Sequence, residues 1–143
     1  MRAKEYLREL ATVEQNIEQL EREIRQLEAR LTSCTANYGE HIGGNSETRE
    51  EGITQLIDAK QAFMDGICQA MRERHKIITE IQGVGDATAS AILYKRYVER
   101  KPLRAVAYEL HYTYDYIRKL HGHALQLFDS RILRGHKMAQ NKC

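Results

Sequence analysis

The chain has 143 residues, of which 29% are charged, with one proline, no tryptophan and a formal net charge of +2. This length suits one domain, or a small domain with an extension, and it can bury a core without disulfide bonds. Cys34, Cys68 and Cys143 are widely spaced and form no C-x-x-C pair, so neither a disulfide framework nor a zinc site is expected. Abundant Leu, Ile, Ala, Glu, Arg and Gln favour helices, and we predict an all-α fold.

No apolar run approaches ~20 residues, and the first ten residues, MRAKEYLREL, are charged from the start. We therefore expect neither a membrane span nor a secretory signal. We expect a cytoplasmic protein of a bacterium or of a phage-infected bacterium. The sequence shows no nucleophile with a partnered base, no phosphate-binding loop and no paired carboxylates in an apolar setting, so we expect no enzymatic activity, no cofactor and no metal.

Apolar residues repeat with alternating spacings of four and three between Tyr6 and Leu31, which is the pattern of a coiled-coil seam. A second helical pattern runs from Ile53 to Ile81, after a break between Thr32 and Thr48 that contains two consecutive glycines. Glutamates flank the first seam and would repel one another in a parallel homodimer. We therefore predict that the two segments of one chain pack together as an antiparallel helical hairpin over residues 1–81.

A hairpin of this kind can serve as a spacer, an oligomerisation surface or a docking arm for a partner. The sequence leaves these three roles open, including a homo-oligomer formed through the hairpin.

The segment from Ile78 to Val98, ITEIQGVGDATASAILYKRYV, allows two interpretations. Gly83, Val84 and Gly85 match the turn of a helix-hairpin-helix element, whose backbone N–H groups bind DNA phosphates without reading sequence. The alternative is a break between helices, with Asp86 capping the next one. Because such elements usually work in pairs and only one copy is present, the break is favoured.

The segment from Pro102 to Phe128 predicts a helix-turn-helix within a C-terminal three-helix domain over residues 82–143. The apolar residues that form the facing sides of its two helices are Val106, Ala107, Leu110, Ile117 and Leu120.

Four residues support the predicted turn and the starts of the two helices. His111 stands where the chain needs a left-handed residue, a position that glycine usually occupies. Pro102 suits the first position of the first helix, and Thr113 can cap the second helix through its hydroxyl. Asp115 then lies in the first turn of that helix, where a negative charge is favourable.

Charge is distributed unevenly along the chain. Residues 1–51 contain 7 Lys or Arg and 11 Asp or Glu, whereas residues 95–143 contain 11 Lys or Arg and 4 Asp or Glu. An acidic N-terminal part and a basic C-terminal part are consistent with a nucleic-acid contact in the C-terminal part. Tyr114, Asp115, Arg118 and Lys119 lie on the outward face of the second helix and suit base edges and phosphates.

The segment Ile92–Leu127 resembles the fourth region of primary-type RNA polymerase sigma factors, and more closely the small phage transcriptional regulators that use the same module. The resemblance rests on ILYKRYV, AVAYEL and YTYDYIRKLHGHAL, and it covers about a quarter of the chain. It implies that residues following the threonine of the recognition helix read a promoter element in the major groove. Sigma factors typically have arginines where this chain has Tyr114 and Tyr116, so their sequence preference does not carry over.

By this resemblance Tyr114, Asp115 and Lys119 would read bases. Thr113, Tyr116 and Arg118 would lie near phosphates or a protein partner. Lys101 and Arg104 complete the candidate DNA-binding residues.

Six of the eight tyrosines lie between Tyr94 and Tyr116, and we expect Tyr97, Tyr108 and Tyr112 to be buried. The histidines of the C-terminal half, at 111, 121, 123 and 136, are expected to be solvated or near phosphates rather than bound to metal. The basic segment from Ser130 onward is expected to fray and to add nonspecific phosphate contacts.

The favoured function is a sequence-specific, double-stranded DNA-binding transcriptional regulator of the phage type, which acts at promoters with RNA polymerase. One alternative is an architectural DNA-binding protein that uses residues 83–85 without sequence preference. Another is a coiled-coil assembly or packaging protein.

Overall fold

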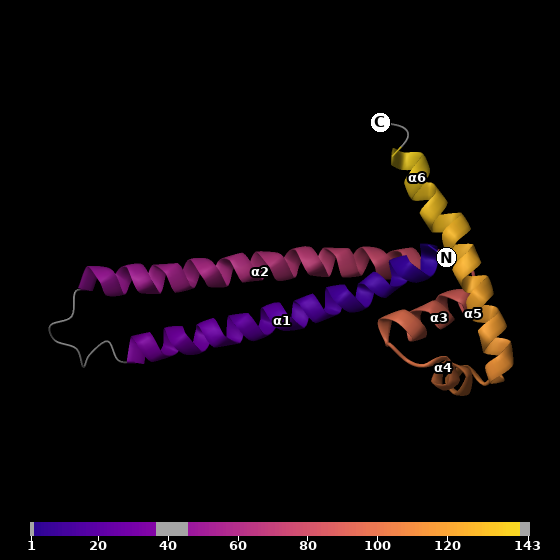
Figure 1. Cartoon of the computed structure of the whole chain (residues 1–143), viewed down its shortest axis with the longest axis horizontal. Helices are drawn as coiled ribbons and strands as arrows, with labels where there is room; N and C mark the ends of the chain where they lie inside the picture. Colours follow the sequence, from indigo (N-terminus) through magenta and orange to yellow (C-terminus); the bar gives the residue numbers. More distant parts are fainter. Residues whose placement is uncertain (1, 37–45, 141–143) are drawn as a thin grey trace. The chain divides into compact units, whose positions relative to one another are not determined.

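The computed structural model describes residues 2–36 and 46–140, and every element in these ranges is a helix (Figure 1). The all-α prediction is confirmed, and the described residues contain no strand. The elements are α1 (Arg2–Ala36), α2 (Ser46–Gln82), α3 (Ala87–Leu93), the π-helical η1 (Tyr94–Val98), α4 (Leu103–Leu110), α5 (Tyr114–Phe128), the π-helical η2 (Asp129–Leu133) and α6 (Arg134–Gln140).

The first two helices are longer than the apolar patterns predict. Helix α1 continues to Ala36 and α2 begins at Ser46, so both ends of the expected break between residues 32 and 48 are helical. The Gly43-Gly44 pair lies outside the described residues. Polar residues such as Thr32 extend the helix, and its hydroxyl donates to the carbonyl oxygen of Glu28 one turn earlier.

The chain divides into two compact units, and one of them is Glu14–Arg72. Within it the later part of α1 lies beside the earlier part of α2 (Figure 1). A Cβ atom placed on Gly66 would lie 3.3 Å from Leu20, which shows how closely the backbone of α2 approaches α1. Lys60 forms a 3.1 Å ion pair with Glu28. Leu20 of α1 lies beside Gly66, whereas the later residue Glu28 pairs with the earlier residue Lys60, so these two segments are antiparallel.

The second unit contains Met1–Val13 and Glu73–Cys143, and it holds the larger hydrophobic core. The predicted domain boundary after residue 81 falls inside this unit. The start of α1 presents Ala3, Leu7 and Leu10 at spacings of four and three, which places them on one helical face. The other buried members of this core are Ile77, Ile81, Val84, Ala89, Leu93, Tyr97, Val98, Ala124, Leu125 and Phe128.

The C-terminal segment belongs to the same unit and is helical through Gln140. Ile132 and Leu133 pack against the core, and the Arg131 guanidinium donates a 2.5 Å hydrogen bond to the carbonyl oxygen of Val84. The expectation that the chain frays from Ser130 onward is therefore wrong for residues 130–140. The sequence window looked polar, but Ile132 and Leu133 pack against the larger core and anchor it.

A second, smaller core holds α4 against α5. Its buried members are Ile92, Val106, Ala107 and Ile117. Leu103, Leu110 and Leu120 are partly buried and pack around them. The inner faces expected for the two short helices are thus the faces that pack.

Candidate nucleic-acid interface

The turn between α4 and α5 is defined by backbone geometry at His111. Its φ and ψ are 60° and 39°, so it adopts the predicted left-handed conformation. The N–H of Tyr112 donates to the carbonyl oxygen of Ala107 at 2.9 Å, and the N–H of His111 donates to Tyr108 at 3.3 Å. This pair of bonds is the Schellman pattern that ends a helix and satisfies its last carbonyls.

The starts of α4 and α5 match the predictions made from the sequence, except at Pro102. Thr113 caps α5, and its hydroxyl oxygen accepts from the N–H of Tyr116 at 3.3 Å. Pro102 does not occupy the first helical position of α4. It precedes that helix with ψ at 152°, and its carbonyl oxygen accepts from Val106. The ring fixes φ near −65° in either case, so the sequence could not distinguish the two placements.

The predicted residues of α5 are gathered at its N-terminal end. Ile117 is fully buried beneath them. The six exposed candidates are Thr113, Tyr114, Asp115, Tyr116, Arg118 and Lys119. Because Ile117 fixes which side of α5 faces α4, the other residues from Thr113 to Lys119 remain exposed.

Arg104 joins this surface from α4. Its guanidinium carbon lies 5.1 Å from the centroid of the Tyr114 ring, and that of Arg118 lies 5.8 Å from the same centroid. Both arginines are exposed. Two predicted site residues from different helices are therefore brought to one aromatic ring.

Lys101 has a different environment from the other candidates. Its ammonium group pairs with Glu109 at 2.6 Å and with Glu99 at 2.8 Å, and Lys95 also pairs with Glu109 at 2.9 Å. Hydrogen bonds to Glu109 and then to Glu99 raise the pKa of Lys101, and the same lysines lower the pKa of Glu109. The charge of Lys101 is thus balanced within the protein, which weakens it as a phosphate contact.

Only one of the three tyrosines expected to be buried is in the core. Tyr97 is 7% exposed, whereas Tyr108 is 84% exposed and Tyr112 is 42% exposed. The expectation is wrong for Tyr108 because it follows Ala107 directly and so points away from the packed face of α4. It is wrong for Tyr112 because the left-handed turn directs this ring toward Tyr116, with centroids 5.2 Å apart.

The Tyr112–Tyr116 pair borders a hollow of about 170 Å³ that the sequence did not reveal. Its other lining residues come from α3, the turn before it, and α5: Asp86, Thr88, Ala89, Ile92, Leu120 and His123. The hollow is formed by two segments, 86–92 and 112–123, that are at least 20 positions apart in the sequence, so no local pattern could have indicated it.

The glycines at 83 and 85 end α2 and lead into α3. The N–H of Gly83 donates to Thr79 at 2.9 Å, and the N–H of Val84 donates to Ile81 at 3.4 Å. Asp86 caps α3 as predicted, because its carboxylate accepts from the N–H of Ala89 at 3.0 Å. Two of the N–H groups that a helix-hairpin-helix would direct to a phosphate bind carbonyls of α2 instead, which favours the interpretation as a helix break.

Two histidines expected to be solvated have partners inside the protein. The His121 ring is half-buried, lies 2.9 Å from the Tyr97 hydroxyl and stacks on that ring. Burial, and then the charges of Arg96 and Lys4, lower the pKa of His121 to about 4. His136 Nε2 lies 2.9 Å from a carboxylate oxygen of Glu80.

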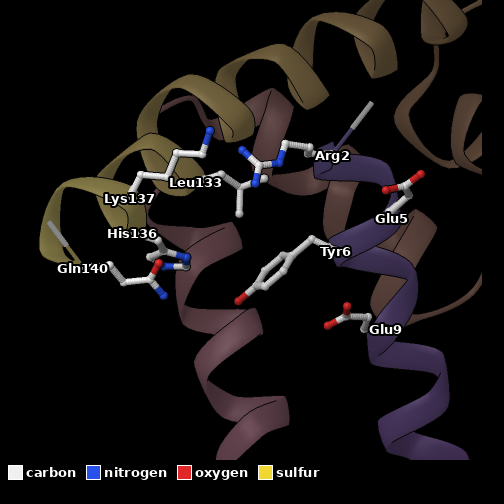
Figure 2. Close-up of a pocket in the computed structure, with 8 residues that line it drawn as sticks. All are labelled: Arg2, Glu5, Tyr6, Glu9, Leu133, His136, Lys137 and Gln140. Carbon is white, nitrogen blue, oxygen red and sulfur yellow. The ribbon is translucent and has the colours of Figure 1, made fainter.

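A cleft of about 290 Å³ lies beside His136, between the start of α1 and α6 (Figure 2). The Tyr6 ring points into it, with carboxylates and cations around its rim. The Tyr6 hydroxyl and His136 are both engaged by Glu80, so they hold these helices together. The lining residues are Arg2, Glu5, Tyr6, Glu9, Leu133, His136, Lys137 and Gln140.

In comparisons with known proteins, no family model, curated protein or solved structure matches this chain.

None of the described helices combines the length and apolar content needed to cross a bilayer. Within residues 2–36 and 46–140, no group of three or more His, Cys, Asp or Glu side chains is placed to hold a metal ion.

Proposed function

We propose that the chain is a sequence-specific, double-stranded DNA-binding transcriptional regulator in which α5 is the recognition helix. The observation that carries the proposal is the exposed end of α5. Polar and aromatic side chains cover it from Thr113 to Lys119, and only Ile117 is buried. A helix held by its inner face, with hydrogen-bonding groups on its outer face, can enter a major groove.

The electrostatics of the surface support a polyanionic partner. Arg104, Arg118 and Lys119 are exposed near the start of α5. The segment 95–143 also carries more basic than acidic residues. Phosphate contacts from such groups supply affinity and register, whereas base edges supply specificity.

Two residues are proposed as base readers. Asp115 can accept a hydrogen bond from cytosine N4, and Lys119 can donate to guanine. They are four residues apart on α5 and therefore lie on the same face of the helix. Lys101 is given a smaller role because Glu99 and Glu109 balance its charge.

Selection of bound duplexes from a random pool tests this proposal directly. The wild type should enrich a discrete site, and Asp115→Ala should relax the preference at one base pair by ~1 to 3 kcal/mol. Asp58→Ala on α2 is the matched control, because it removes an exposed carboxylate from the other unit. Identical preferred sites for the wild type and Asp115→Ala would exclude base reading by Asp115, and no enriched site for the wild type would exclude sequence-specific binding.

The salt dependence of binding tests the phosphate contacts. Replacing both Arg104 and Arg118 by alanine should lower the log-log salt slope by about two, one for each lost phosphate contact. The matched control replaces Arg22 and Arg25, two exposed arginines of α1, and should leave the slope unchanged. An unchanged slope in the Arg104 and Arg118 variant would remove both residues from the interface.

We also propose that the protein acts at a promoter together with RNA polymerase, because residues 92–127 resemble sigma region four. Transcription from a template that carries the selected site, with and without the protein, tests it. A homo-oligomer formed through α1 and α2 is a separate prediction, and sedimentation at several protein concentrations tests that one.

A further inference from the structure

The ring of Tyr114 is the meeting point of two exposed cations. Arg104 comes from the first turn of α4, and Arg118 follows Tyr114 by four residues on α5. Their guanidinium carbons lie 5.1 Å and 5.8 Å from the centroid of this one ring. Distances of this size bring a cation under the attraction of the electron-rich ring face.

An arginine held in this way is better prepared to bind an anion than a freely rotating one. A free arginine loses much of its rotamer entropy when it binds, and that loss opposes affinity. The planar guanidinium also matches the paired oxygens of a phosphate, so its orientation matters as well as its charge. A ring that holds two arginines together reduces the ordering cost of both.

We infer that Tyr114 is a positioning residue that holds Arg104 and Arg118 as a two-arginine clamp for the phosphodiester backbone of duplex DNA. This inference rests on the proposed function, and it gives Tyr114 a role other than the base reading implied by the family resemblance. Tyr114 would then affect affinity through the arginines and leave the preferred sequence unchanged. Base reading would remain with Asp115 and Lys119.

A double-mutant cycle on the full chain separates these roles. Titrations use the duplex selected by the wild type, with wild type, Tyr114→Leu, Tyr114→Phe, the Arg104→Ala plus Arg118→Ala variant, and the triple variant with Tyr114→Leu. Tyr114→Leu should weaken binding roughly fivefold to thirtyfold, because two long side chains must be ordered on binding. Tyr114→Phe should stay within about twofold of the wild type, because it keeps the ring.

The decisive comparison is made without the arginines. Once both are alanine, Tyr114→Leu should have no further effect on affinity, since nothing remains for the ring to hold. The site selected by Tyr114→Leu should equal the wild-type site. If Tyr114→Leu weakens binding as much in the arginine-free background as it does in the wild type, the inference is overturned and Tyr114 is a direct contact. A changed base preference in Tyr114→Leu would overturn it as well.

A measurement on the free protein keeps this inference separable from the proposed function. The side-chain NMR signals of Arg104 and Arg118 should be shifted by the Tyr114 ring in the wild type and in Tyr114→Phe, and should lose that shift in Tyr114→Leu. Absence of a ring shift overturns the inference whether or not DNA binds. A wild type that binds no duplex overturns the proposed function and the clamp with it. If the wild type binds but the effects of Tyr114→Leu and of the two arginine substitutions on affinity are additive, only the clamp is overturned.

Discussion

The hydroxyl group of Tyr6 donates a 2.7 Å hydrogen bond to the carboxylate of Glu80, 74 positions later in the chain. His136 meets the other carboxylate oxygen of Glu80 at 2.9 Å. Burial and the neighbouring Glu80 both raise the pKa of Tyr6, so its hydroxyl stays protonated and can donate. One carboxylate therefore links the start of α1, the end of α2 and α6.

We expect Tyr6→Phe to lower the free energy of unfolding by about 1 to 3 kcal/mol, because it removes a hydrogen bond to a charged acceptor and leaves Glu80 with one partner fewer. Urea unfolding followed by circular dichroism measures this change. Tyr108→Phe is the control, since this tyrosine is 84% exposed and should change stability very little. Equal stabilities of Tyr6→Phe and the wild type would show that the hydrogen bond contributes nothing.

Leu7→Ala should cost about 2 to 5 kcal/mol of stability, because Leu7 is fully buried in the larger core and its removal leaves a cavity. Met64→Ala removes a side chain of similar size that is 44% exposed, and it should cost far less. The same urea experiment compares the two variants. A Leu7→Ala cost no larger than that of Met64→Ala would argue against the packing of α1 in this core.

The fragment 82–143 should unfold without a cooperative transition when it is produced alone. It lacks Leu7, Leu10, Ile77 and Ile81, which belong to the same hydrophobic core as Phe128 in the intact chain. Exposure of that apolar surface removes much of the driving force for folding. A well-dispersed NMR spectrum and a sharp thermal transition from the fragment would instead support the boundary predicted after residue 81.

His111→Val should destabilise the protein by about 1 to 2 kcal/mol, because a β-branched residue tolerates a φ of 60° poorly. His111→Gly should leave stability unchanged or raise it, since glycine adopts this conformation without steric cost. Thermal unfolding of both variants measures the difference. A Val variant as stable as the Gly variant would mean that the turn changes its conformation to accommodate valine.

Stability should fall as the pH falls from about 6.5 toward 4, in part through His121. The folded protein holds the pKa of this ring at about 4, below its ordinary 6.5, so the unfolded chain binds the proton more tightly in this window. The contribution is fully present above pH 6.5 and is lost as the pH falls toward 4.

Urea unfolding at several pH values tests this assignment. His121→Gln should flatten the dependence between pH 6.5 and 4, because glutamine has no proton to bind. His123→Gln replaces an exposed histidine and should keep the wild-type profile. A profile unchanged by His121→Gln would assign the pH dependence to other groups.

The sequence alone determined the helical class, the turn between α4 and α5 and the caps at Asp86 and Thr113. These features depend on contacts within a few residues, and the spacing of apolar residues records them directly. The inner residues Val106, Ala107 and Ile117 were predictable for the same reason.

Only the tertiary structure decided which distant segments share a core and which side chains meet. The start of α1 packs with Phe128, Tyr108 is exposed, residues 130–140 are anchored, and Arg104 reaches the ring that Arg118 also approaches. Helical periodicity shows that a face is apolar, but it does not show which other face covers it, because that choice depends on the path of the whole chain in space. For this reason the exposed positions at the start of α5 could be predicted one by one, while the contacts among them could not.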